Sequence, residues 1–504
     1  MMRISVILFL MLTVDCLFAQ NQFWENIEGP YGGLINSISL FNNDIYCAGI
    51  GGVYMSNDNG ERWISIGLKD KVIKKIRISN NYLFAISNSG CFRMNLSDTS
   101  WINVKQGQWQ SMYTKDSTIF IGSEYAGIFR STDLGFTWLE VNNGIDNRDI
   151  EEILITSNNI VLASAAGTSG SGVFRSTNNG DSWERIDPYQ FAWNFEGIAE
   201  YNGVLYAFDF TNSAKVYKST DFGLTWFLPV NTSAPSDIIQ TIYVDESGIY
   251  VGVYHYGIFK STNEGASWTN GNSGLNNKNV LAISANVSNL FCASYDGIYN
   301  SSKSNLSWLK KSEGINNIWI SSLGANNNQL IFGTYGSGLF TYKNNIFKRK
   351  SLGSDLMFII DLKVFNNQIY VLSSSWSSSS YANFQYSNDY GNSWILANNG
   401  FDTGGLKCID VNNKYIYVGS WYGLFRKQIT GNYWEKLTNG IPNNVNISSV
   451  ASSDSIVIVT NGTSEIYRST DYGSSWQSMY VQNLFSGTRV YSKNKGEFYL
   501  GSAQ

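Results

Sequence analysis

The sequence has little of the chemistry on which many enzymes depend. Its 504 residues include one histidine, His255, and charged residues make up only 15%, against roughly 25% in an average soluble domain. A single histidine excludes a zinc site that needs two, and any Ser-His or Cys-His catalytic pair would have to use His255. The five cysteines form no Cys-x-x-Cys pair, and we interpret Cys47, Cys91, Cys292 and Cys408 as small buried hydrophobic residues. We therefore expect no metal and no cofactor.

The charge balance excludes two further classes of partner. Lys and Arg number 35 and Asp and Glu number 39, which gives a net charge of −4. Proteins that bind nucleic acid or an anionic membrane surface carry a basic patch instead. No nucleic-acid partner is predicted.

The residues that are abundant favour β-structure. The chain has 47 glycines, 16 tryptophans, 31 tyrosines and 28 phenylalanines, but only five prolines. Aromatic residues are enriched in strands, and glycine is enriched in the tight turns that join them. No amphipathic stretch of helical length interrupts this pattern, so the composition predicts an all-β protein.

The N-terminus has the pattern of a secretory signal peptide. Arg3 precedes an apolar run of about 11 residues, and Ala19 offers a small residue for cleavage, which predicts a signal peptide over 1–19. A membrane span needs about 20 apolar residues, and no later segment reaches that length. We expect the mature protein to be secreted or held at the cell surface, without a membrane span and as a monomer.

One motif is repeated along the chain. Ser-x-Asp/Asn-x-Gly-x-x-Trp occurs seven times, ending at Trp63, Trp138, Trp183, Trp226, Trp268, Trp394 and Trp476. Eroded copies end at Trp101, Trp308, Phe347 and Trp434, and an isolated fourth-strand start lies at Trp24. The mean spacing of these marks is about 41 residues, within the period of propeller blades. The spacing predicts a β-propeller of about 12 four-stranded blades.

Each repeat unit is predicted to contain four short strands. Between Gly144 and Trp183 they are expected at 150–156, at 160–165, at 172–176 and from Trp183 onward, because these runs are β-branched or aromatic and are bounded by Asn, Gly and Ser.

The motif itself is explained by turn chemistry. Its Asp or Asn can accept hydrogen bonds from backbone N–H groups, its Gly can adopt positive φ, and its Trp can pack on the neighbouring blade. An acid that recurs in nearly every blade is a poor candidate for a single active site. The motif residues predicted to be structural are Asp58, Asp133, Asn178, Asp221, Asn263, Asp389 and Asp471.

The motif resembles the Asp-box, or BNR, repeat, and the resemblance covers nearly all of the chain after the signal peptide. Similar repeats occur in sortilin-type receptors, photosystem II stability/assembly-factor-like proteins, sialidases, and xyloglucan-specific endoglucanases built from two seven-bladed propellers. The resemblance implies a propeller fold. Function does not follow from a fold alone.

Twelve blades are many for one ring, so two consecutive propellers are predicted. The first, of about seven blades, is expected over 20–300, closed by the strand at Trp24, and the second over 301–504. The sequence stops at Gln504 within the second strand of a unit, so the second ring is expected to be truncated, with further repeats encoded downstream.

The family comparisons argue against hydrolysis. The five prolines do not form the Phe-Arg-Ile-Pro-like segment of sialidases. Xyloglucanase-like enzymes carry a Thr-Asp-Ile-Gly-Gly segment with a catalytic Asp, whereas this chain has Ala48-Gly49-Ile50-Gly51-Gly52, with Gly49 in place of the carboxylate. No catalytic residue is predicted.

Aromatic residues recur in the loops opposite the motif turns, where they could stack on sugars or anchor a peptide. We therefore predict a secreted, non-catalytic propeller that binds a polysaccharide or an extracellular protein. The alternatives are a glycoside hydrolase of the double-propeller or sialidase-like type, and a structural scaffold module of a surface or adhesion protein. The candidate ligand-binding residues are Trp193, Tyr254, His255, Tyr295, Trp319, Tyr335, Trp376 and Trp421.

Overall fold

The computed structural model is all-β. It describes residues 32–501 except 99, 166–171, 187–194, 210–214, 229–236, 314–315, 318–319, 327–328, 345, 353–357, 375–381, 402–404, 462–464, 481–488 and 493–496. The described part contains strands and turns but no helix. None of it is a helix that could span a membrane. The contacts divide the chain into two units, residues 31–318 and residues 319–504 together with 1–30.

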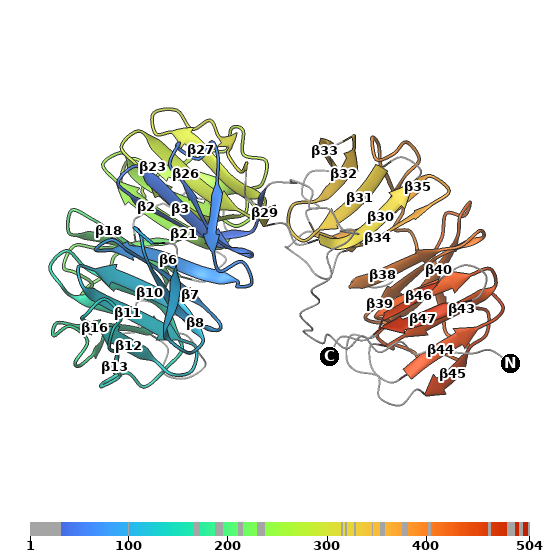
Figure 1. Cartoon of the computed structure of the whole chain (residues 1–504), viewed down its shortest axis with the longest axis horizontal. Coiled ribbons are helices and arrows are strands. Elements are labelled where there is room, and N and C mark those ends of the chain that lie inside the picture. Colours follow the sequence, from blue (N-terminus) through green and yellow to red (C-terminus); the bar gives the residue numbers. More distant parts are fainter. Residues whose placement is uncertain are drawn as a thin grey trace, which may run out of the picture. The chain divides into compact units, whose positions relative to one another are not determined.

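In the unit of residues 31–318, the residues that the structure describes form seven sheets of successive antiparallel strands, coloured blue to yellow-green in Figure 1. Their strands are β2 (Ile35–Phe41), β3 (Asp44–Gly49), β4 (Gly52–Ser56), β5 (Ile64–Gly67); β6 (Ile73–Ser79), β7 (Tyr82–Ser87), β8 (Gly90–Asn95), β9 (Trp101–Lys105); β10 (Trp109–Lys115), β11 (Thr118–Ser123), β12 (Ile128–Ser131), β13 (Leu139–Glu140); β14 (Ile150–Ile155), β15 (Val161–Ala165), β16 (Gly172–Ser176), β17 (Glu184–Ile186); β18 (Phe195–Tyr201), β19 (Val204–Asp209), β20 (Val216–Ser219); β21 (Ile239–Asp245), β22 (Gly248–Val253), β23 (Gly257–Ser261), β24 (Thr269–Asn270); and β25 (Val280–Ala285), β26 (Asn289–Ser294), β27 (Gly297–Ser302), β28 (Leu309–Lys310).

The first strands of these seven sheets form the inner wall of a ring. Each contacts the first strand of the next sheet, and β2 of the first sheet contacts β25 of the last. A parallel pair between β1 (Gly32–Gly33) and β29 (Asn316–Asn317) adds a second link between the ends of this unit. The last sheet takes its fourth strand, β28, from its own segment. The fourth strand expected from Trp24 is therefore not needed there, and Trp24 itself lies outside the described residues.

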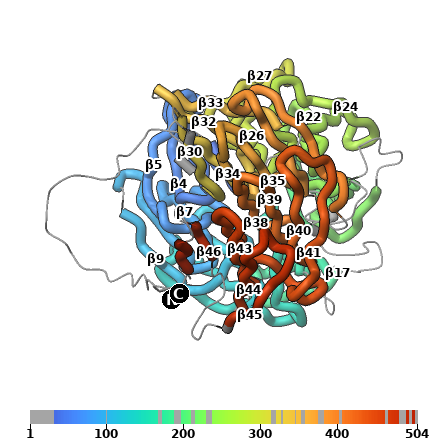
Figure 2. The backbone as a smooth tube through the Cα atoms, turned by 90° about the vertical axis from the view of Figure 1, so that its right-hand side faces the viewer, coloured from blue at the N-terminus to red at the C-terminus, as the bar shows by residue number. Residues whose placement is uncertain are grey.

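The described residues of the other unit form four four-stranded sheets and one two-stranded sheet. Figure 2 shows the strands of one of them, β38 to β41, following one another in the orange part of the backbone. The strands of this unit are β30 (Ile320–Asn326), β31 (Gln329–Thr334), β32 (Leu339–Lys343), β33 (Ile346–Lys350); β34 (Phe358–Phe365), β35 (Gln368–Ser374), β36 (Ala382–Ser387), β37 (Ile395–Leu396); β38 (Leu406–Val411), β39 (Tyr415–Ser420), β40 (Gly423–Gln428), β41 (Glu435–Leu437); β42 (Ser449–Ser453), β43 (Ile456–Thr460), β44 (Glu465–Ser469), β45 (Gln477–Tyr480); and β46 (Arg489–Ser492), β47 (Phe498–Gly501).

The predicted strands agree with the observed ones to within about a residue. The unit used as the example has strands at Ile150–Ile155, Val161–Ala165 and Gly172–Ser176, with the fourth at Glu184–Ile186. The β-propeller fold predicted from the repeats is confirmed.

The repeat turn has the hydrogen bonds that its composition predicts. In the copy ending at Trp138, the Asp133 carboxylate accepts from the backbone N–H of Thr137 at 2.8 Å and from its hydroxyl at 2.6 Å. The Gly135 N–H donates to the Ser131 hydroxyl at 2.8 Å, and Gly135 has φ 81°. These hydrogen bonds lower the pKa of Asp133 to about 2.

In some copies the tryptophan of the motif joins neighbouring sheets, as Trp183 does. The Trp183 indole donates to the Val141 carbonyl, next to the fourth strand of the preceding sheet, at 2.8 Å. Its ring also meets Phe120 of that sheet edge to face at a centroid distance of 6.4 Å. Because Trp183 is 6% exposed, it stabilises the interface between two sheets.

Candidate active site

A β-bulge marks the start of the inner strand in each of the seven ring-forming sheets of the 31–318 unit. In β14, Ile150 pairs with Ala165 and Glu152 with Ser164, so Glu151 is the extra residue between them. Bulges often lie next to active sites because they redirect a side chain. The bulged residues of the seven sheets are Asn36, Lys74, Gln110, Glu151, Glu196, Gln240 and Leu281.

All seven bulges lie at the same face of the ring. The pairing of Ile150 with Ala165 places the start of each first strand beside the end of the second strand. The repeat turns follow the third strand, whose last residue Ser176 pairs with Val161 at the opposite end. The bulged side chains and the turns between second and third strands therefore share one face, opposite the repeat turns.

Three acidic residues gather on this face around Glu151. Burial, and after it the neighbouring carboxylates of Glu196, Asp149 and Glu124, raise the pKa of Glu151 to about 7 against the opposing effect of Lys74. We call Glu124, Asp149, Glu151 and Glu196 the acidic mouth. A carboxyl group with a pKa of about 7 is about half protonated at neutral pH and can donate a proton.

Asp149 and Glu196, two other members of the acidic mouth, lie in different environments. The Asp149 carboxylate accepts a 2.6 Å hydrogen bond from the Gln110 amide, and burial raises its pKa. Glu196 lies on the adjacent inner strand, β18. Two carboxyl groups in different environments can divide the roles of acid and base.

The next residue along β14 has a fixed cationic partner. Glu152 receives both of its hydrogen bonds from the Lys75 ammonium, at 2.8 and 2.6 Å. Burial lowers the pKa of Lys75, although Glu152 counteracts this effect. Glu152 is thus held in an ion pair with Lys75, whereas the carboxyl group with the raised pKa is that of Glu151.

Three of the aromatic-loop candidates lie together on the same face. The rings of Tyr254 and His255 have centroids 3.7 Å apart, and the Asp237 carboxylate lies 3.3 Å from Nδ1 of His255. Burial raises the pKa of Tyr254, and the nearby Tyr295 also raises it. Tyr254 and Tyr295 are only 8% and 4% exposed, so both rings pack into the protein.

The remaining candidates lie in the other unit or outside the described residues. Tyr335 is 45% exposed and meets Phe358 edge to face at 4.7 Å, and Trp421 is 56% exposed with the Lys407 ammonium 3.9 Å from its ring. Trp193, Trp319 and Trp376 fall outside the described residues. The part these residues play in ligand binding stays a prediction.

Gly49 leaves no room for a carboxylate. A Cβ atom at this position would lie 2.0 Å from the Leu34 carbonyl oxygen. The backbone therefore requires glycine here, and any acid needed for hydrolysis has to come from another position. Within the described ranges, no group of three or more His, Cys, Asp or Glu residues is arranged to hold a metal ion.

Sequence reasoning did not identify the acidic mouth. Glu151 and Glu196 lie 45 residues apart and have no local motif around them. The available signal was the repeat period itself, because aligning the units at their first strands would have placed these two acids at equivalent positions.

Known proteins that are similar to this chain share its fold, and those with a stated activity are xyloglucanases. No family model matches the chain. It is 25% identical over 264 residues to a xyloglucanase from a Paenibacillus species and 24% identical over 259 residues to a xyloglucanase from Acetivibrio thermocellus. Each match covers 49% of this chain but only 22% and 26% of the respective relative.

Solved structures show the same propeller fold. The GH74 xyloglucanase of Xanthomonas campestris matches with a TM-score of 0.66 at 13% identity, covering 92% of this chain and 83% of that one. An ancestral GH74 enzyme matches with a TM-score of 0.67 at 16% identity, covering 95% and 81%.

These relatives correct one expectation. The sequence was interpreted as that of a non-catalytic binding protein, partly because Gly49 replaces a catalytic Asp. The matched relatives are xyloglucanases, so that interpretation is wrong, and the comparisons favour the glycoside hydrolase alternative.

Proposed function

We propose that this protein is a glycoside hydrolase that cleaves a xyloglucan-type polysaccharide at the acidic mouth of its 31–318 unit. Glycoside hydrolysis commonly uses a pair of carboxyl groups, one of which protonates the departing sugar oxygen. In this proposal Glu151 is the general acid, and Glu196 or Asp149 is the ionised partner.

The observation that carries the proposal is the environment of Glu151. Burial and three neighbouring carboxylates raise its pKa to about 7, so it keeps its proton where an ordinary glutamic acid is ionised. The ring gives this group rigid support, because its strand pairs with β15 and packs between β10 and β18. Similarity to xyloglucanases supports the choice of substrate class.

The finer parts of the proposal follow from the sequence. The repeat turns are of the Asp-box type, the N-terminal segment over 1–19 directs secretion, and the substrate is met outside the cell. The exposed ring of Trp421 would serve as a stacking surface for sugar.

Substitution of Glu151 tests the proposal. Reducing ends released from xyloglucan are measured for the full chain and for Glu151→Gln. Loss of a general acid should lower kcat by about 10²- to 10⁴-fold. The matched control is Glu184→Gln, an exposed acid on the outer strand of the same sheet, which should retain activity.

The pH profile gives an independent measure. Because the general acid must be protonated, kcat/KM should fall as pH rises through about 7, the pKa of Glu151. Full activity of Glu151→Gln on xyloglucan, or no xyloglucan cleavage by the unmodified protein, would contradict the proposal.

A further inference from the structure

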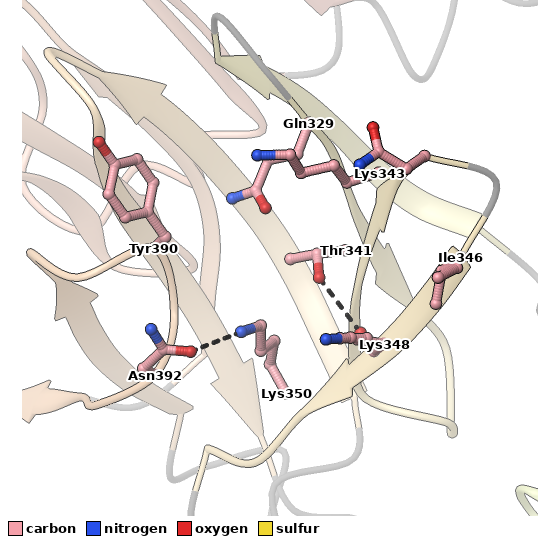
Figure 3. A pocket seen from close by; sticks show the side chains of 9 residues that line it. Gln329, Thr341, Lys343, Ile346, Lys348, Lys350, Tyr390 and Asn392 are labelled. Carbon is pink, nitrogen blue, oxygen red and sulfur yellow. Dashed lines mark hydrogen bonds between the residues drawn. The ribbon is translucent and has the colours of Figure 1, made fainter.

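A lysine-lined cavity lies in the other unit, between two neighbouring sheets. Its volume is about 530 Å³, and it lies between the outer strands β32 and β33 and the repeat turn that follows β36. Figure 3 shows Lys343, Lys348 and Lys350 on one side and Tyr390 with Asn392 on the other. All of these residues belong to the 319–504 unit.

The cavity forms where the repeat motif has been lost. In the seven intact copies the third and fourth strands are joined by the Ser-x-Asp/Asn turn, as between β36 and β37, which make only two pairs. In the eroded unit only two residues separate β32 from β33, and these strands make five pairs, from Leu339 with Lys350 to Lys343 with Ile346. The longer hairpin takes the place of the turn that would otherwise occupy this edge.

Strand geometry places the lysines on one face. Side chains two residues apart point to the same side of a strand, and Thr341 pairs with Lys348 while Lys343 pairs with Ile346. Lys343, Lys348 and Lys350 therefore face the cavity together. The alternate residues Tyr342 and Phe347 contact each other, with ring centroids 4.6 Å apart.

The cavity has positive charge with little internal neutralisation. The Lys350 ammonium donates to the Asn392 amide oxygen at 2.8 Å. In the described part of the chain, the ammonium groups of Lys343 and Lys348 have no ion-pair or hydrogen-bond partner, and no acidic residue is among those that line the cavity. Three cations held around one hollow attract an anion even though the whole chain has a net charge of −4.

The rest of the lining suits a sugar ring. Tyr390 is 50% exposed and Ile346 is 55% exposed, and they stand on opposite sides of the hollow (Figure 3). Aromatic rings stack on the apolar faces of sugars, and Gln329 and Asn392 supply amides for hydroxyl groups. A cavity of this volume lies within the usual range for small-ligand sites, about 300–1,000 Å³.

We propose that this cavity binds a carboxylated polysaccharide, one built of uronic acid residues, and tethers the protein to it. The lysines contact the sugar carboxylates and Tyr390 stacks on a ring. This site does not depend on the acidic mouth, and its ligand differs from the neutral substrate proposed there.

Binding of oligogalacturonate to the full chain tests the proposal, with the fully methyl-esterified oligomer as the matched ligand that lacks the charge. Isothermal titration at low salt should show binding of the acid form and at least about tenfold weaker binding of the ester, since hydrogen bonds to charged groups are among the stronger ones. Added salt should weaken binding of the acid form.

Two double variants distinguish binding at the cavity from an effect of the overall charge of the protein. Lys343→Gln with Lys348→Gln should weaken binding at least about tenfold and leave xyloglucan cleavage unchanged. Arg62→Gln with Lys69→Gln removes the same charge from two exposed residues of the 31–318 unit and should leave binding unchanged. Thermal melting verifies that both double variants are folded.

Several outcomes would overturn the proposal. They are equal binding of acid and ester, equal losses in the two double variants, no binding of the acid form, and equally tight binding of a single-stranded oligonucleotide of the same charge. The last result would indicate a general polyanion surface.

Discussion

At the scale of single residues, the same carboxyl chemistry has opposite consequences in different places. Asp133 in a repeat turn accepts several hydrogen bonds, and its pKa falls to about 2. Glu151 at the acidic mouth is partly buried among other acids, and its pKa rises to about 7. Hydrogen bonding stabilises the ionised form in the first case, and loss of solvation destabilises it in the second.

Glu151 is expected to cost stability at alkaline pH. A carboxyl group whose pKa is higher in the folded protein binds more protons there than in the unfolded chain, so stability falls as pH rises between about 4.5 and 7. Glu151→Gln should therefore raise the free energy of unfolding at pH 8 by about 1 to 2 kcal/mol after allowance for solvent screening.

Urea unfolding at pH 8 and pH 4.5 measures this effect. The gain should fall to well under about 1 kcal/mol at the lower pH, where Glu151 is protonated in the folded protein and about half protonated in the unfolded chain. A variant that is equally or less stable than the unmodified protein at pH 8 would show that the environment of Glu151 is not the one described.

Asp133 offers the opposite case in a turn. Asp133→Ala removes the acceptor for Thr137 and should lower the free energy of unfolding by about 1 kcal/mol. Asp133→Asn should keep most of the stability, because Asn178 accepts the equivalent bond from the Ser182 N–H at 3.0 Å in another copy. Xyloglucan cleavage should be unaffected in both, and its loss in a variant with unchanged melting temperature would contradict a structural role.

At the scale of strands, a recurring hydrogen bond joins the inner wall. Ser37 accepts from the Ile76 N–H at 3.1 Å in one unit, and Ser449 accepts from the Val490 N–H at 3.0 Å in the other. Asp361 occupies this position in β34 and accepts from the Ile409 N–H at 2.9 Å. Burial raises the pKa of Asp361 to about 6. A carboxylate thus replaces the serine hydroxyl as acceptor, and its ionisation lowers the stability of the folded protein.

Asp361→Ser should restore the hydroxyl and stabilise the protein at neutral pH. The raised pKa means that ionisation of Asp361 opposes folding as pH rises from about 4 to 6, so the gain should reach about 1 to 2 kcal/mol above pH 6 and fall to well under about 1 kcal/mol near pH 4. Chemical denaturation at the two pH values measures this gain in stability.

Asp410→Ser is the contrasting variant, because Asp410 is ion-paired with Lys363 at 2.5 Å and accepts from the Ser452 hydroxyl at 2.7 Å. It should lose stability, and a loss in Asp361→Ser as well would contradict the prediction.

The strands and turns were predictable from sequence for a physical reason, whereas the site was not. The Asp133 turn and the Trp183 contact each depend on residues within one short motif or one period, so local spacing reveals them. The acidic mouth depends on a bulge at Glu151 and on Glu196 in the next sheet, and the burial that raises the pKa arises only in the closed ring. The burial of Tyr254 and Tyr295 was likewise hidden, because a loop aromatic can face inward or outward without a change in sequence pattern.

At the scale of the 31–318 unit, closure depends on contacts between residues far apart in sequence. The Trp63 indole donates to the Lys311 carbonyl at 2.8 Å across 248 residues, and the Trp63 N–H donates to the Glu313 carbonyl at 2.8 Å. Trp183 makes the equivalent indole contact between two sheets that are consecutive in the chain. The two tryptophans therefore have the same local chemistry and different roles in the ring.

Trp63→Phe and Trp183→Phe should separate those roles. Each removes one indole hydrogen bond and should lower the free energy of unfolding by about 1 kcal/mol. Only Trp63→Phe weakens the contact between the first sheet, β2–β5, and the last sheet, β25–β28, which are not joined by a short loop. These two sheets should therefore separate locally before the ring unfolds. Amide hydrogen exchange should therefore speed up in β2 and β25 for Trp63→Phe, and only around β13 and β17 for Trp183→Phe. Because the acidic mouth needs a closed ring to bury Glu151, Trp63→Phe should also reduce xyloglucan cleavage more than Trp183→Phe does. Equal effects of the two variants on hydrogen exchange and on cleavage would show that closure of the ring does not depend on the Trp63 contact.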